Sequence, residues 1–143
     1  MKKIGFLMLA AILTAAIGIA EPATVYVNGP ASRITPDDPT EVYYFHMTRR
    51  CMTCQTVEKV AEQSIKELYP DALKKGTLTF KSVNIEEKEN KALVKKLNIG
   101  GQTLLIVNGK NRHDITDKGF MYAVNEPDKL KAEIKLILDK YVK

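Results

Sequence analysis

The chain has 143 residues, 45% of them hydrophobic, and 22 Lys and Arg against 17 Asp and Glu give it a formal net charge of +5. This length is that of one domain, and the composition is that of a globular protein rather than a low-complexity chain. The lysines alternate with glutamates instead of clustering beside aromatic residues, so we expect no nucleic-acid partner.

The first twenty residues form an apolar segment that we interpret as a cleaved signal peptide. Lys2 and Lys3 give it a basic start, an apolar run extends from Ile4 to Ile19, and Gly18-Ile19-Ala20 is a suitable cleavage tripeptide. A retained membrane anchor is the alternative, since about 16 apolar residues is near the lower limit for a span. Cleavage leaves one domain of about 120 residues with a net charge of about +3. We therefore expect export to the periplasm or another extracytoplasmic compartment.

Residues 21–40 carry four of the six prolines, which predicts an extended N-terminal leader before a domain over 41–143. Within the domain, apolar periodicity and breaker residues predict strands and helices that alternate. The strands are expected over 41–47, 77–85, 103–107 and 110–116, and the helices over 53–69, over 86–97 and from Pro127 onward.

The first strand contains the uninterrupted run Val42-Tyr43-Tyr44-Phe45, which indicates a strand buried on both faces. Alternation of strands with helices predicts parallel pairing for the first strands. Asn108-Gly109 predicts a two-residue hairpin turn, and therefore an antiparallel pair at the end of the sheet.

Both cysteines lie in Arg49-Arg50-Cys51-Met52-Thr53-Cys54, between the first strand and the first helix. Cys-x-x-Cys at such a junction suits thiol–disulfide chemistry, because the first sulfur lies among the free N–H groups of the helix N-terminus. A bridge across two residues constrains the unfolded chain little, so an inert structural disulfide is a poor explanation. We expect Arg49 and Arg50 to lower the pKa of Cys51, with two solvated loop charges as the alternative. Thr53 is either part of this site or only a helix-start residue.

Soft-metal binding is the main alternative function. Side chains that suit Cu(I) lie within nine positions, at His46, Met47, Cys51, Met52 and Cys54. His46 and Met47 end a strand on opposite faces, so we do not expect both to reach one ion, and we expect Met47 in the core. A structural zinc site needs four ligands, so we assign no metal.

The order of elements, with Cys-x-x-Cys after the first strand, resembles the thioredoxin fold over about residues 41–142. The segment from Thr103 to Lys110 is similar to the strand-turn-strand segment of that family. The resemblance implies an α/β, three-layer fold, with a central mixed sheet flanked by helices, and no organic cofactor. It also implies that Cys51 is the exposed nucleophile, that Cys54 is the resolving thiol, and that Met52 and Thr53 tune the reduction potential.

Three positions depart from the family pattern. Arg50 stands where thioredoxins usually carry tryptophan, and Phe45 stands where they bury a carboxylate beneath the cysteines. Gly101-Gln102-Thr103 replaces the cis-proline that shapes the substrate groove. Because two glycines precede Gln102, we expect a trans peptide there, in a loop that still lies beside Cys51.

The sequence therefore predicts an exported, monomeric thiol–disulfide oxidoreductase that acts on client proteins with thiols or disulfides. Outside the cytoplasm it would need a membrane electron donor or acceptor. The residues leave open whether it reduces, oxidises or isomerises its clients. A redox-inactive binding module with a vestigial pair is the third class of function. His113 lies on the polar last strand and is expected at the surface.

Overall fold

The computed structural model describes residues 38–142, all of which belong to one compact unit. The predicted signal peptide, residues 1–20, and most of the predicted leader, residues 21–40, lie outside the described residues. The first strand, β1 (Thr40–His46), starts at the last residue of that leader. Thr40 is buried and pairs with residues of the strands on both sides of β1, so the domain begins slightly earlier than predicted.

Four strands form one mixed sheet in the order β2-β1-β3-β4. Strand β2 (Leu78–Asn84) is parallel to β1, and β3 (Thr103–Asn108) is antiparallel to it. Strand β4 (Asn111–Asp114) pairs antiparallel with β3 at the edge. The parallel and antiparallel pairings predicted from the element order are confirmed.

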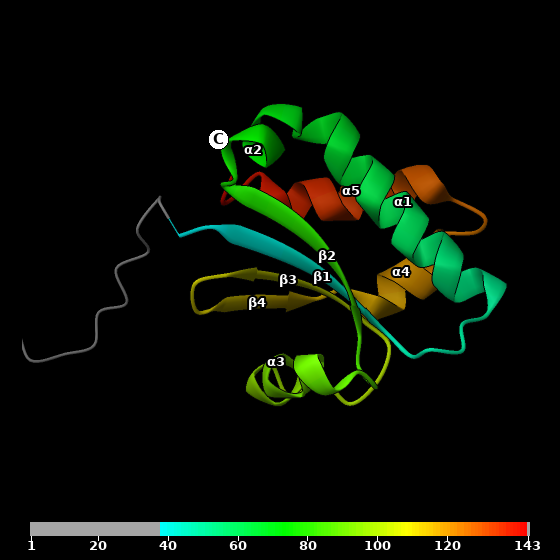
Figure 1. Cartoon of the computed structure of the whole chain (residues 1–143). Helices are drawn as coiled ribbons and strands as arrows, with labels where there is room; N and C mark the ends of the chain where they lie inside the picture. Colours follow the sequence, from blue (N-terminus) through cyan, green and yellow to red (C-terminus); the bar gives the residue numbers. More distant parts are fainter. Residues whose placement is uncertain (1–37, 143) are drawn as a thin grey trace, which may run out of the picture. The chain divides into compact units, whose positions relative to one another are not determined.

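Helices cover both faces of this sheet, which confirms the three-layer arrangement (Figure 1). One face packs against α1 (Met52–Leu68), α2 (Pro70–Lys75), α4 (Thr116–Tyr122) and α5 (Pro127–Leu138). The other face packs against α3 (Lys91–Lys96), which follows the short 3-10 helix η1 (Lys88–Asn90). The run from Val42 to Phe45 is buried on both faces as predicted, because alternate side chains enter the two helical layers.

The helix after β2 starts later than the predicted 86–97. The acidic residues expected in its first turn form other hydrogen bonds. Glu86 accepts one from the backbone N–H of Thr48 at 2.8 Å, and Glu87 accepts hydrogen bonds from two asparagine side chains. Asn98, with φ 48°, follows the helix and stops it, because this left-handed conformation does not continue a helix.

Two short helices were not predicted. Helix α1 ends just before Pro70, as predicted, but Pro70 also begins α2, since a proline is well suited to the first helical turn. Helix α4 begins at Thr116, which was predicted as the end of the last strand. The Asp114 carboxylate accepts hydrogen bonds from the backbone N–H of Thr116 at 3.1 Å and from its hydroxyl at 2.6 Å, and this turns the chain out of the sheet.

The hairpin turn lies one residue later than predicted, at Gly109-Lys110. Asn108 stays in β3 and is only 4% exposed. Its side-chain amide donates to the backbone oxygen of Asp38 at 2.8 Å and to the Thr40 hydroxyl at 3.0 Å. These bonds hold Asn108 in the ladder, and Gly109 takes the positive φ of 55° that the turn needs.

Two side chains do not lie where the sequence placed them. Met47, expected in the core, is 40% exposed, because β1 ends at His46 and the chain leaves the sheet there. His113, expected at the surface, is half-buried, and its Nε2 lies 2.7 Å from the hydroxyl of Tyr141 near the C-terminus.

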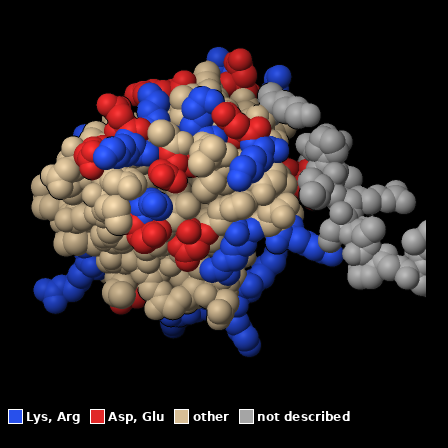
Figure 2. All heavy atoms as spheres, turned by 180° about the vertical axis from the view of Figure 1, so that it is seen from behind, with Lys and Arg blue, Asp and Glu red and all other residues tan. Residues whose placement is uncertain are grey.

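Charged side chains of both signs lie next to one another over much of the face shown in Figure 2. This is the distribution expected when lysines and glutamates alternate along a chain. In the part of the chain that the structure describes, no helix has the length and apolar character needed to cross a membrane.

Candidate active site

The cysteine pair lies where β1 leads into α1, and the intervening loop is held by the end of β2. The backbone N–H of Thr48 donates to Glu86, and the Thr48 hydroxyl accepts from the Asn84 side chain at 3.0 Å. Both partners lie at or just after the end of β2, the parallel neighbour of β1. These hydrogen bonds fix the position of the loop, and therefore the position of Cys51 after it.

Cys51 occupies the N-cap position of α1, with φ −79° and ψ 166°. Its sulfur accepts a hydrogen bond from the backbone N–H of Cys54 at 3.4 Å, as a serine or aspartate oxygen does at this position. The side chain is exposed. A thiolate at a helix N-terminus is stabilised by the free N–H groups and by the helix dipole.

Cys54 lies one turn into α1 and is 2% exposed. Its sulfur is 2.7 Å from the sulfur of Cys51 and 3.2 Å from the side-chain oxygen of Gln102. A thiol has one proton, so Cys54 can donate to Cys51 or to Gln102 but not to both at once.

The two sulfurs ionise at different pH. Hydrogen bonds from the Cys54 thiol, and then from the backbone N–H of Cys54, hold the pKa of Cys51 below its ordinary value. Burial raises the pKa of Cys54, and the neighbouring Cys51 sulfur raises it further. Cys51 is therefore the thiol that loses its proton first, and it is also the one that a substrate can reach.

The two arginines differ in their surroundings. Arg50 forms an ion pair with Glu58 of α1, and the two side chains are 26% and 18% exposed. Arg49 is exposed. The main groups that lower the pKa of Cys51 are the Cys54 thiol and backbone N–H groups at the start of α1. A contribution of either arginine to this pKa stays a prediction.

The other predicted site residues lie around the pair. Met52 is 79% exposed next to Cys51, and Thr53, in the first turn of α1, is half-buried. Thr103 is the first residue of β3, and its hydroxyl donates to the backbone oxygen of Gly101 at 3.1 Å. The Gly101–Gln102 peptide is trans as predicted, since residues 38–142 contain no cis peptide bond. The loop touches the pair through the Gln102 side chain, and the sulfur it touches is that of Cys54.

Sequence reasoning missed two residues near the pair, Tyr44 and Glu58. It placed Phe45 beneath the cysteines instead, and that expectation is wrong, because Phe45 packs on the opposite face of the sheet with the α3 layer. Tyr44, like Val42, enters the layer of α1. Strand alternation in β1 could have shown this, because Val42 and Tyr44 share a face. Glu58 lies four residues after Cys54, a spacing that places both on one side of a helix.

No group of three or more His, Cys, Asp or Glu side chains is close enough to hold a metal ion within residues 38–142. His46, one of the soft-metal candidates, places Nδ1 2.9 Å from the backbone oxygen of Met47 and stacks on the Tyr44 ring at 6.3 Å between ring centres. Copper binding by Cys51 and Cys54 stays a prediction.

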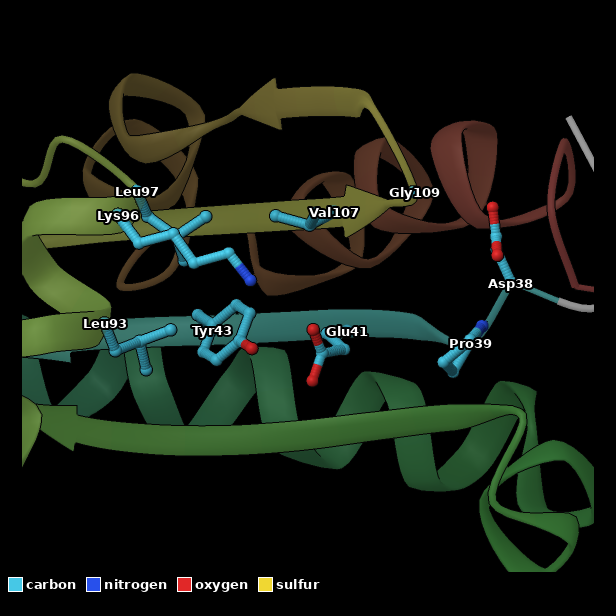
Figure 3. Close-up of a pocket in the computed structure, with 9 residues that line it drawn as sticks. All are labelled: Asp38, Pro39, Glu41, Tyr43, Leu93, Lys96, Leu97, Val107 and Gly109. Atoms are coloured by element: carbon cyan, nitrogen blue, oxygen red, sulfur yellow. The ribbon is translucent and has the colours of Figure 1, made fainter. Parts of the chain in front are cut away.

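A shallow groove of about 200 Å³ lies near the start of β1, whereas Cys51 follows the end of that strand (Figure 3). Tyr43, Leu93 and Leu97 supply apolar surface, and Glu41 and Lys96 supply charge. The groove is thus separate from the cysteine pair.

No protein-family model and no curated protein sequence matches the chain. Among solved structures, it is similar to thioredoxin O2 from Arabidopsis thaliana, with a TM-score of 0.49 and 21% identity over 69% of this chain and 75% of that one. A thioredoxin from Trypanosoma brucei brucei has a TM-score of 0.44 and 19% identity, over 74% of this chain and 80% of its own. The germline-specific thioredoxin Deadhead from Drosophila melanogaster has a TM-score of 0.42 and 18% identity, over 69% and 81%.

The arrangement of strands and helices identifies the fold. A mixed sheet in the order β2-β1-β3-β4 has helices on both faces. Cys-x-x-Cys opens the helix that follows the inner strand β1. The described domain therefore has the thioredoxin-like fold, as the order of elements in the sequence predicts.

Proposed function

We propose that the protein is an exported thiol–disulfide oxidoreductase that works through Cys51 and Cys54. The observation that carries the proposal is the asymmetry of the pair. One sulfur is exposed at a helix N-cap with a lowered pKa, and the other is buried beside it with a raised pKa. Disulfide exchange needs an accessible thiolate and a second thiol within reach of it.

The reaction takes place in two exchanges. The Cys51 thiolate attacks a client disulfide, forms an S–S bond to one client sulfur, and releases the other as a thiolate that takes a proton. The Cys54 thiol then loses its proton and attacks the Cys51 sulfur, and the second client sulfur leaves. Two electrons have passed to the client, and the pair has become a disulfide. Oxidation of client thiols runs through the same steps in reverse.

Residues 1–20 would direct the chain out of the cytoplasm, and the expected clients are extracytoplasmic proteins with thiols or disulfides. A catalyst of this kind returns to its starting state only if another protein exchanges electrons with it. We therefore propose a membrane electron donor for a reducing role, or an acceptor for an oxidising one.

Trapping tests the roles of the two cysteines. Cys54→Ser removes the resolving thiol, so clients should accumulate as mixed disulfides on Cys51. Cys51→Ser removes the accessible nucleophile and should trap almost nothing. Adducts are counted on non-reducing gels after acid quenching, with the Cys51→Ser/Cys54→Ser double variant as the control. Equal trapping by the two single variants would contradict the assignment, and absence of exchange by the wild type would favour a binding module.

A further inference from the structure

The buried Cys54 sulfur has few groups near it that can respond when its charge changes. Within residues 38–142 its side-chain partners are the Cys51 sulfur at 2.7 Å and the Gln102 side-chain oxygen at 3.2 Å. Cys54 is 2% exposed, so water solvates its sulfur poorly. Once Cys51 is bonded to a client, its sulfur carries no charge and is only a weak acceptor. Gln102 is then the side chain left to interact with the Cys54 sulfur.

Gln102 reaches this sulfur from the loop before β3. The Thr103 hydroxyl holds that loop, because it donates to the backbone oxygen of Gly101 at 3.1 Å. The cis-proline that this segment replaces in the thioredoxin pattern has no side-chain amide to offer. The contact between Gln102 and Cys54 is thus a property of this chain.

The Gln102 amide can interact with both forms of Cys54, because it carries an acceptor oxygen and a donor NH₂ group. The oxygen accepts a hydrogen bond from the thiol and so favours the protonated form. A half turn about the last side-chain torsion exchanges the two groups, and such a torsion is broadly two-fold. Since the oxygen lies 3.2 Å from the sulfur, the half turn brings the NH₂ group to about the same distance. In residues 38–142 no hydrogen bond to a third group opposes the turn.

We propose that Gln102 is a catalytic residue of the second exchange, in which its amide turns and donates an N–H to the Cys54 sulfur as Cys54 ionises to release the client. This inference rests on the proposed function. Burial raises the pKa of Cys54 and opposes that ionisation, whereas the backbone of Cys51 and the Gln102 side chain act in the opposite direction. A neutral donor already in contact with the sulfur stabilises the new charge where water cannot.

The second exchange then needs no further reactant. The Cys54 thiol gives its proton to the departing client thiolate or to solvent, and the electron pair left on its sulfur forms the bond to Cys51. The bond between Cys51 and the client breaks, and its electron pair leaves on the client sulfur. The Gln102 amide keeps its protons throughout.

Gln102→Met tests the proposal, because it keeps the length of the side chain and removes the donor. The reduced protein is mixed with one equivalent of Ellman's reagent in a stopped-flow instrument. Attack by Cys51 releases one thionitrobenzoate, and attack by Cys54 then releases the second at a rate that does not depend on the reagent concentration. We expect the first phase to change by less than about twofold. At neutral pH the second should slow by about tenfold or more, the effect of losing one hydrogen bond to a charged group.

The pH dependence separates this role from a structural one. Loss of the N–H donor destabilises the thiolate and raises the pKa of Cys54, so the second phase should reach half its maximum rate at a pH higher by about one unit. Above that pH Cys54 is ionised in both proteins, and their rates should converge. Gln102→Glu replaces the NH₂ group by a second oxygen and adds a negative charge. It should slow the second phase at neutral pH at least as much as Gln102→Met does.

Gln55→Met is the matched control. Gln55 follows Cys54 in α1, is exposed, and directs its amide N–H at the backbone oxygen of Arg50 at 3.5 Å. The same substitution there should leave both phases within about twofold of the wild type. Urea denaturation of the reduced proteins checks that each variant is folded.

An unchanged second phase in both Gln102 variants would overturn the inference. So would a second phase that is slowed equally at every pH, because that result would indicate a displaced Cys54 rather than a less favourable ionisation. Equal slowing of both phases would assign the Gln102 loop a structural role and would also overturn it. A wild type that releases only one thionitrobenzoate would instead contradict the proposed function, whatever the variants do.

Discussion

Cys51 and Cys54 are neighbours on one helical turn, yet the groups around their sulfurs favour opposite protonation states. The Cys51 sulfur accepts hydrogen bonds and is open to solvent, and both features stabilise a thiolate. The Cys54 sulfur is buried, and the nearest charge that can form beside it is the Cys51 thiolate. The order in which the two thiols lose their protons thus follows from the helix start, which gives the Cys51 sulfur its N–H donors, and from the packing that buries Cys54.

The contribution of the Cys54 thiol to the pKa of Cys51 can be isolated with two variants. Cys54→Ser and Cys54→Ala both remove the second sulfur, but only serine keeps a side-chain donor at that position. Because a donor stabilises the thiolate, the alkylation rate of Cys51 should reach half its maximum at a higher pH in Cys54→Ala than in Cys54→Ser. The measurement is the rate of reaction with iodoacetamide from pH 5 to 10. The same midpoint in both variants would mean that backbone N–H groups alone lower this pKa.

The sequence located this pair, and the resemblance to the thioredoxin fold implied that Cys51 is its exposed member, which the structure confirms. The sequence did not show that Arg50 pairs with Glu58. That contact depends on where the loop before α1 lies against the helix, which local patterns do not encode. The sequence placed Phe45 beneath the pair, whereas the structure has Tyr44 on that face of the sheet. An error of one position moves a strand residue to the opposite face.

Among the elements, α1 and α4 come close together over β3. A Cβ atom added at Gly119 of α4 would lie 3.0 Å from a Val57 methyl carbon and 3.5 Å from a Leu104 methyl carbon. A helix interior normally favours alanine over glycine by about 1 kcal/mol. The absence of a side chain at this position therefore allows the close approach of the two helices.

Gly119→Ala should accordingly destabilise the domain. Overpacking of a core costs about 1 to 3 kcal/mol, which exceeds the gain in helix propensity, so we expect a net loss on the order of 1 kcal/mol. Gly100→Ala is the matched control, because a Cβ there has no atom within 4 Å and φ is not positive. It should change the free energy of unfolding by less than about 0.5 kcal/mol. Urea denaturation measures both, and a Gly119→Ala domain as stable as the wild type would contradict the packing argument.

Elements with a long apolar period were predictable, as β1, α1 and α5 show. The short helices were not, because one or two turns carry too little periodicity. In α4 the start is set by the Asp114 carboxylate and by a hydrogen bond from the backbone N–H of Leu104 to the Thr116 hydroxyl. The second of these is a long-range contact with β3. A long-range contact also explains why Glu86 is not in the predicted helix, since it accepts a hydrogen bond from Thr48, in the loop after β1.

For the whole molecule, the parts of the site converge from separate segments of the sequence. Cys51 follows β1, the loop before it is held from the end of β2, and Gln102 precedes β3. The pair therefore depends on the assembled sheet rather than on its own segment. Its chemistry also depends on the compartment, because an oxidising environment favours the disulfide and a reducing one the dithiol.

Processing of residues 1–20 decides whether this domain works as a free protein or on a membrane. The full chain, expressed in a bacterial host that has a periplasm, should yield a periplasmic protein whose intact mass corresponds to a start at Glu21. Signal peptidases need a small residue before the cleaved bond, so Ala20→Tyr should leave the precursor uncut in the membrane fraction. Ala23→Tyr places the same side chain just beyond the predicted site and should be processed normally. A wild-type protein that keeps Met1 and stays with the membrane would show that the segment is an anchor, and the electron donor or acceptor would then meet a tethered domain.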